Sequence, residues 1–214
     1  YGVYINQFIS STADTEVRES RLKIKMNSTL LQDGKVQIEV QSSGPGNLNI
    51  RIPWYSGKCE CVQNGIPIEI QPEKGYQRLS ISPGDTYISL DFHVSPRWMG
   101  ANNGVRADAG KAALMKGPLV YCLEEKENGR YLSEIFIEEN TSIEETAPAE
   151  ELVGNVPTLS YKGIRVRNKG AAGENQLYGN VELEKEEVSL QAVPYCMWNN
   201  RGEGEMLVWH KLRV

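Results

Sequence analysis

The sequence is poor in the residues that build disulfide and metal sites. Its 214 residues include only two histidines and four cysteines. Four cysteines are too few for the disulfide framework of a small secreted scaffold, and they do not reveal the compartment of the protein. His93 and His210 each lie in an alternating segment, and we predict that both face solvent. The composition therefore excludes a disulfide-rich fold.

Long apolar runs and an excess of basic charge are also absent. No apolar run approaches the roughly 18 residues that a transmembrane helix needs, so no membrane-spanning segment is predicted. The net charge is -5, and residues 1–100 carry as many basic as acidic side chains, so the whole acidic excess lies in the second half. An acidic domain repels phosphate groups, which argues against nucleic-acid binding.

Short segments with a period of two dominate the sequence. Basic and apolar residues alternate in Arg21–Met26, and polar and apolar residues alternate in Ile88–Val94, which predicts two half-buried strands. Asp33-Gly34 predicts a type I′ hairpin turn. About eight such strands precede residue 95, with turn signals roughly every ten residues, and this spacing is typical of a β-sandwich. No segment has the apolar spacing of a substantial helix.

The stretch Lys111–Glu124 organises the second half of the chain. Gly117-Pro118 separates two short runs that are both predicted strands. The second run, Leu119–Leu123, is apolar at every position, as expected for a strand that is covered on both faces. We therefore predict that Leu119, Tyr121 and Leu123 belong to the core of a second domain.

These patterns predict an all-β fold of two sandwich-like domains, residues 1–100 and 101–214, with little or no helix. The segment Trp98–Gly104 is the predicted linker because it is rich in glycine and asparagine. The acidic segment Glu138–Glu151 is predicted to be a loop or an exposed turn, and Gly170–Asn175 is predicted to be a flexible loop.

Three segments carry a family resemblance, in the expected order along the chain. They are Leu48–Trp54 (LNIRIPW), Ala107–Glu124 (ADAGKAALMKGPLVYCLE) and Val193–Trp209 (VPYCMWNNRGEGEMLVW). Together they resemble glycoside hydrolase family 127, the β-L-arabinofuranosidase family. The resemblance implies the all-β carboxyl-terminal part of that family without its catalytic barrel. A first residue of Tyr rather than Met fits a fragment, and the compartment, bacterial periplasm or cytoplasm, stays open because any signal peptide would precede it.

The resemblance also implies where zinc would be held in the parent protein. The family has a zinc-held cysteine nucleophile assisted by a glutamate, with a Glu-x-Cys element and a Cys-Cys pair. Here Glu60 directly adjoins Cys61, and no Cys-Cys pair exists. Cys59 and Cys61 share one strand face, but a zinc site needs about two more ligands and the spacing supplies none. No catalytic, cofactor-binding or metal-binding residue is therefore assigned to this chain, and zinc would belong to the missing barrel.

Glu203 and Glu205 are the best-placed pair of carboxylates. On an extended segment they would lie about 6–7 Å apart, a separation that glycoside hydrolysis can use. They lie in a Gly-rich turn, however, so we predict surface carboxylates, one of which pairs with Arg201.

Three hypotheses for function follow. In the first, the chain is inactive by itself and braces the missing barrel. It should then expose apolar surface through Tyr1, Val3, Ile5 and Phe8, with Trp54 or Trp98 nearby. In the alternative, it is a carbohydrate-binding module for arabinose-containing glycans, and Trp54 and Trp98 stack on the sugar. A third hypothesis, that the chain is itself an enzyme, finds no acid/base or metal set to support it.

Overall fold

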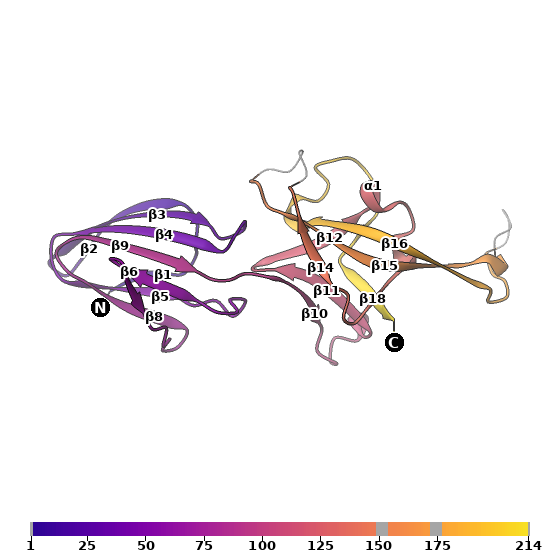
Figure 1. The fold of residues 1–214 in the computed structure, drawn as a ribbon, viewed down its shortest axis with the longest axis horizontal. Helices are drawn as coiled ribbons and strands as arrows, with labels where there is room; N and C mark the ends of the chain where they lie inside the picture. The colour runs from indigo at the N-terminus through magenta and orange to yellow at the C-terminus, as the bar shows by residue number, and fades with distance from the viewer. Residues whose placement is uncertain (1, 149–153, 172–176, 214) are drawn as a thin grey trace. The chain divides into compact units, whose positions relative to one another are not determined.

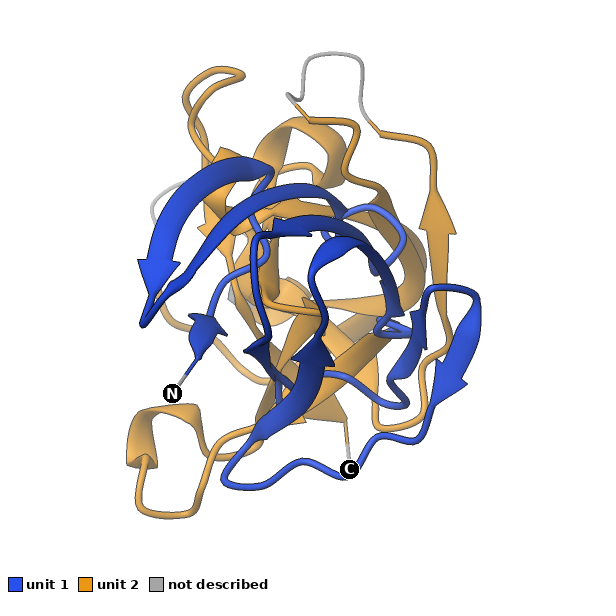
Figure 2. Ribbon diagram, turned by 90° about the vertical axis from the view of Figure 1, so that its left-hand side faces the viewer, with its two compact units in different colours: residues 1–95 blue, residues 96–214 orange. Residues whose placement is uncertain are grey.

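The computed structural model describes residues 2–148, 154–171 and 177–213. It divides the chain into two compact units, Tyr1–Ser95 and Pro96–Val214, each with its own hydrophobic core (Figures 1 and 2). Among the described residues the only α-helix is α1 (Glu125–Asn128), a single turn. Four three-residue 3-10 turns accompany it, at Arg106–Asp108, Leu132–Glu134, Lys169–Ala171 and Tyr195–Met197. The all-β prediction is confirmed, and no helix in the described part of the chain is long and apolar enough to cross a membrane.

The first unit contains two sheets. A six-stranded sheet has the order β2-β3-β4-β9-β6-β7, with the bounds Ser11–Val17, Ser20–Thr29, Lys35–Ser42, Gly84–Asp91, Glu60–Gln63 and Ile66–Ile68. A three-stranded sheet has the order β1-β5-β8, with the bounds Val3–Ile5, Gly46–Arg51 and Tyr76–Ile81. All neighbouring strands are antiparallel except β1 and β5, which are parallel.

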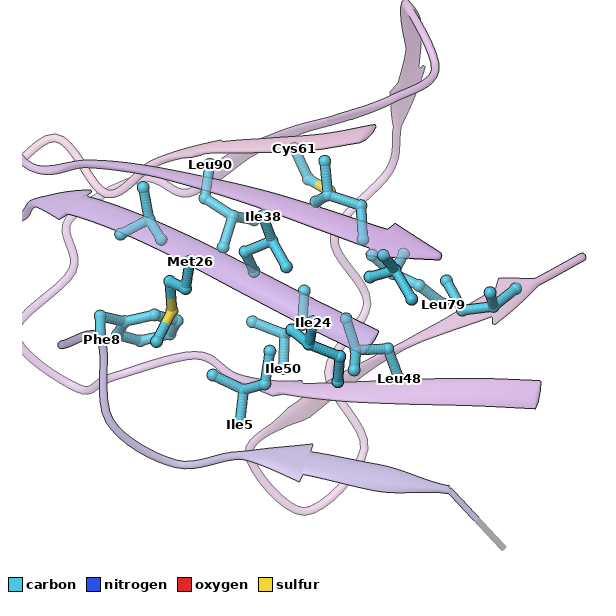
Figure 3. Packing of buried hydrophobic residues seen from close by; sticks show 14 of the residues in the cluster. Ile5, Phe8, Ile24, Met26, Ile38, Leu48, Ile50, Cys61, Leu79 and Leu90 are labelled. Atoms are coloured by element: carbon cyan, nitrogen blue, oxygen red, sulfur yellow. The ribbon is translucent and has the colours of Figure 1, made fainter. Parts of the chain in front are cut away.

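The core of the first unit lies where side chains of both sheets meet. Along β3, Leu22, Ile24 and Met26 are buried while the basic residues between them are exposed, as the alternation predicts. Figure 3 shows Ile24 beside Leu48 and Ile50, which come from β5 of the other sheet, and Met26 beside Phe8. The period-two pattern therefore identifies the buried face because the opposite face of an antiparallel sheet is open to water.

The turns at Asp33-Gly34 and Asn64-Gly65 differ in structure. At Asp33-Gly34 only Gly34 has a positive φ, 85°, and its amide donates to the carbonyl of Leu30, so this turn is longer than the type I′ turn that we predicted. At Asn64-Gly65 both residues have positive φ, 50° and 80°, and they join β6 to β7. That pair of angles is the one a two-residue type I′ hairpin requires.

The second unit is built from one nine-stranded sheet. The strands, in the order β10-β11-β18-β13-β15-β16-β12-β17, have the bounds Pro96–Gly100, Lys111–Lys116, Trp209–Arg213, Ile135–Glu138, Thr158–Asn168, Leu183–Pro194, Leu119–Glu124 and Met206–Leu207, and β14 (Ile143–Thr146) pairs with β15. Because β11 also pairs with β12, the strands from β11 through β18 to β12 close into a ring. The sheet is therefore barrel-like.

Two loop predictions in this unit were wrong. Trp98–Gly100, part of the predicted linker, belongs to β10 and pairs with β11. Within the acidic segment, Ile143–Thr146 forms β14, antiparallel to β15. A strand with one neighbour needs only one apolar face, so its acidic residues did not reveal it. Residues 149–151 of the acidic segment and 172–175 of the predicted flexible loop lie outside the described residues.

The strand β12 confirms the prediction of a segment covered on both faces. Tyr121, Cys122 and Leu123 are all fully buried. Tyr121 and Leu123 belong to the main core of the second unit, whereas Cys122 packs with Val193 in a smaller cluster on the other face. The Tyr121 hydroxyl donates to the carbonyl of Pro157 at 2.9 Å, so its polar end is also satisfied.

Replacing Leu123 by alanine should lower the free energy of unfolding by about 2–3 kcal/mol, because a fully buried side chain is lost and a cavity remains. Leu119→Ala, at the half-buried start of the same strand, should cost less and serves as the matched control. Denaturant unfolding of both variants measures the difference. Equal losses would mean that the two positions are buried alike.

Candidate functional site

The two closely spaced cysteines are packing residues of the first core. Cys61 is buried in β6, and Cys59 packs against the same core from just before that strand. Burial raises the pKa of Cys59 to about 12 and that of Cys61 to about 11. Both side chains are therefore protonated at neutral pH in the metal-free chain. Among the residues that the structure describes, no three His, Cys, Asp or Glu side chains gather as metal ligands would.

The carboxylate pair lies in a loop with no room for a sugar. The Glu205 carboxylate accepts a hydrogen bond from the amide of Leu132 at 2.8 Å, while Glu203 is exposed. The hollow between this loop and Trp198 has a volume of about 10 Å³, which holds about one water molecule. Glu205 therefore ties two loops together.

Arg201 has different partners from those we predicted. Its guanidinium binds Glu127 through two hydrogen bonds, at 2.7 and 3.0 Å, and also binds Glu124. The Arg201 side chain is only 3% exposed. The predicted pairing with Glu203 or Glu205 was wrong because the actual partners lie 74 and 77 residues away in the sequence.

This buried ion cluster joins the loop that contains Asn199 and Arg201 to β12 and α1. Besides Arg201, the cluster receives the amide of Asn199, which donates to Glu124 at 3.3 Å. The amide of Glu125 donates to the carbonyl of Glu205 at 3.0 Å, and the amide of Glu205 donates to the Glu125 carboxylate at 3.0 Å. These charged groups hold backbone in place.

A second buried polar group is centred on His210 in β18, where the prediction of a solvent-facing side chain was wrong. His210 is fully buried, and its Nε2 lies 2.6 Å from the Tyr161 hydroxyl. Its Nδ1 lies 3.0 Å from the carbonyl of Val208, so Nδ1 donates and Nε2 accepts the proton of Tyr161. Burial lowers the pKa of His210 to about 4. His93, by contrast, is exposed beside Glu60.

The two tryptophans proposed for sugar stacking differ in their surroundings. The Trp98 ring meets Tyr161 and His210 edge-on, at centroid distances of 5.0 and 5.3 Å, and its Nε1 donates to the carbonyl of Thr141. Trp54 is largely exposed, with Tyr55 beside it at 6.1 Å. Stacking on a sugar stays a prediction, and Trp54 is the one with most of its surface open to solvent.

Exposed apolar surface is found in a place that we did not predict. Ile5 and Phe8 belong to the first core and Val3 packs against it, so the expectation that these three are exposed was wrong, and Tyr1 lies outside the described residues. The same end of the chain does expose Tyr4 (60%) and Ile9 (64%). The segment Leu177–Leu183, which we call the apolar segment, exposes four large side chains: Leu177 (87%), Tyr178 (88%), Val181 (77%) and Leu183 (56%). In the sequence, Val181 and Leu183 read as part of an alternating strand, but only Leu183 belongs to β16, so the sequence pattern did not predict the exposure of this segment.

The fold and these contacts define an all-β region of two units whose buried charges hold loops in place. Two family models match it in succession: the middle domain of the family 127 β-L-arabinofuranosidases over residues 2–93, and the glycoside hydrolase family 127 C-terminal domain over residues 96–211. The chain belongs to glycoside hydrolase family 127.

Individual relatives agree with this assignment. The chain is 32% identical to a non-reducing end β-L-arabinofuranosidase from Bifidobacterium longum subsp. longum, over 98% of the chain and 33% of that protein. The crystal structure of a family 127 β-L-arabinofuranosidase from Geobacillus stearothermophilus T6 matches with a TM-score of 0.87 and 31% identity, again over 98% of the chain and 33% of the other. A family 127 β-arabinofuranosidase with 23% identity has the same fold, with a TM-score of 0.85 over 98% of the chain and 34% of the other. The chain therefore spans about a third of the length of these relatives.

Proposed function

We propose that this chain is the non-catalytic β region of a β-L-arabinofuranosidase-like protein and that it braces the catalytic barrel of that parent protein. The observation that carries the proposal is the apolar segment, in which four large side chains are more than half exposed within seven residues. Large apolar side chains that are exposed close together in the sequence are candidates for an interface, and an interface between domains of one chain covers surface of this kind. Because the relatives are about three times longer, the covering element would be the rest of the parent.

The roles of the charged residues support a bracing function. Arg201 pairs with both Glu124 and Glu127 in a buried cluster, and Glu205 is tied to a backbone amide. Arg165, which is nearly buried, donates to the carbonyls of Asn128, Arg130 and Tyr131. Residues held in this way give a rigid body, which is what a brace requires, and they leave the hydrolytic chemistry to the parent's barrel.

Replacing Val181 by aspartate in the full-length parent should loosen the barrel, because a charge would be buried at the proposed interface. We expect the barrel to unfold at a temperature several degrees lower and to be cut faster by protease. In the isolated 214-residue chain the same change should have little effect, because Val181 is exposed there. Thermal unfolding and limited proteolysis of both proteins measure this.

Val105→Asp is the matched control, since Val105 is another exposed valine of the second unit. It should leave the parent unchanged. If Val181→Asp behaves like this control while deletion of residues 96–214 destabilises the barrel, bracing occurs through another surface. If the deletion also has no effect, the bracing proposal is wrong.

A further inference from the structure

The outer face of the six-stranded sheet in the first unit carries a groove. It lies over β2, β3, β4 and β9 and has a volume of about 460 Å³, within the range of small-molecule binding sites. The side chains that point outward into it come from alternate positions on these strands: Thr12, Asp14, Lys23, Lys25, Glu39, Gln41, Asp85 and Tyr87.

Strand register places these side chains in rows that run across the sheet. Thr12 is paired with Lys25, Lys25 with Glu39, and Glu39 with Tyr87, so four neighbouring strands contribute to one row. A second row is displaced from the first by two residues along each strand, and it consists of Asp14, Lys23, Gln41 and Asp85. Paired residues on one face have Cβ atoms about 5 Å apart, so the side chains of a row can contact one extended ligand together.

Tyr87 stands in the middle of this surface. A second hollow of about 390 Å³ begins on its other side, shares Tyr87 and Glu39 with the first, and reaches Val62 on β6. The backbone of Tyr87 is fixed by two hydrogen bonds of 2.8 Å with Asn64, through both the amide and the carbonyl. The side chain is 59% exposed. The ring is thus held on a rigid strand between two hollows and is open to a ligand.

The chemistry of the groove selects among ligands. The groove holds three carboxylates and two ammonium groups. Asp14 accepts two hydrogen bonds of 2.8 Å from Arg21, and Lys25 and Glu39 lie 3.8 Å apart, so the face offers no excess positive charge to a polyanion. An apolar peptide or lipid would leave these charged groups without water or partners. A neutral ligand rich in hydroxyl groups suits them, because carboxylate, amide and ammonium groups bind hydroxyls while the tyrosine ring packs against the apolar face of a sugar.

We propose that this groove binds a neutral oligosaccharide, with Tyr87 as the stacking residue and the two rows of polar side chains as its hydrogen-bonding partners. The expected sugar is an L-arabinofuranosyl oligosaccharide, and that choice alone rests on the proposed function. The strand alternation contained the signal: Tyr87 takes an outward position between Asp85 and Ser89, where the neighbouring outward residues are polar.

Calorimetric titration of the 214-residue chain with L-arabinofuranosyl, xylosyl and galactosyl oligosaccharides tests the proposal. We expect a dissociation constant of about 10 μM to 1 mM for the arabinofuranosyl series. Tyr87→Ala should weaken binding at least about tenfold, the equivalent of roughly 1.4 kcal/mol. Tyr131→Ala is the matched control, because Tyr131 is exposed to the same degree, 57%, in the other unit, and it should bind as the unchanged chain does.

Three outcomes would contradict sugar binding in the groove. The first is no saturable heat with any of the sugars at concentrations about 10-fold above the expected dissociation constants. The second is binding by Tyr87→Ala that equals that of the unchanged chain, and the third is loss of binding in Trp54→Ala alone. Saturable binding of xylosyl or galactosyl but not arabinofuranosyl sugars would support oligosaccharide binding in the groove. It would contradict the choice of an arabinofuranosyl ligand, which rests on the family. The bracing test in the parent protein does not depend on this titration, so the two proposals can fail separately.

Discussion

Replacement of Arg201 by methionine should lower the stability of the second unit by about 3–5 kcal/mol. Methionine fills a similar volume, but it leaves the nearly buried carboxylates of Glu124 and Glu127 without their counter-charge. Removing one partner of a buried ion pair costs more than the pair contributes, because the remaining charge is desolvated and unpaired. Denaturant unfolding followed by tryptophan fluorescence suits this measurement, since Trp98, Trp198 and Trp209 lie in the second unit.

Arg213→Met provides the control for this experiment. Arg213 pairs with Glu138 at 3.3 Å, but the pair is largely exposed, so its loss should cost less than about 1 kcal/mol. The triple variant Arg201→Met, Glu124→Gln, Glu127→Gln should regain part of the stability, because no unpaired charge remains in it. A loss at Arg201 no greater than that at Arg213 would show that the buried cluster is not important for stability.

The second large effect should appear as pH falls from 7 to 4. The pKa of His210 is about 4 in the folded chain and its ordinary value is 6.5, so the unfolded chain takes up a proton first. The stabilisation is complete above pH 6.5 and is lost as pH falls toward 4, at about 1.4 kcal/mol per pH unit, which amounts to roughly 3 kcal/mol. Below pH 4 both states are protonated and the loss stops growing.

A comparison of variants isolates this effect from the titration of carboxylates. His210→Gln keeps a hydrogen-bond acceptor for Tyr161 but cannot titrate, so its stability should depend on pH less steeply than that of the unchanged chain. His93→Gln, at the other histidine of the chain, removes an exposed imidazole and is the control variant. Urea unfolding between pH 4 and 7 gives the slopes. Identical slopes for the unchanged chain and His210→Gln would refute the assignment.

Strands could be predicted where the two faces of a sheet differ in polarity. Leu22, Ile24 and Met26 alternate because water covers one side of β3, and Leu119–Leu123 is apolar throughout because protein covers both sides of β12. β14 was missed since an edge strand can be polar on most of its surface. The turn at Asp33-Gly34 was predicted in the right place with the wrong type, because only one of its residues has a positive φ.

The buried polar contacts could not be predicted, because each depends on a partner far away in the sequence. Arg201 lies 74 residues from Glu127, and His210 lies 49 residues from Tyr161. A local sequence pattern predicts that a polar residue lies at the surface, because the pattern does not show the distant residue that would pair with it in the core. The groove at Tyr87 was missed for a related reason: the alternation gave its outward direction, but only strand register brings Thr12, Lys25 and Glu39 to it.

The ring of strands in the second unit also determines when this part of the chain can fold during synthesis. Strand β18 (Trp209–Arg213) fits between β11 and β13, and its partner residues lie about 100 positions earlier in β11 and 75 positions earlier in β13. Until it leaves the ribosome, β11 and β13 each present an open edge to other nascent chains. The first unit has its own hydrophobic core within residues up to Ser95, all of which are made before β18. Translation therefore leaves a period in which one finished unit is followed by an unfinished ring, and a chaperone would be needed most during that period.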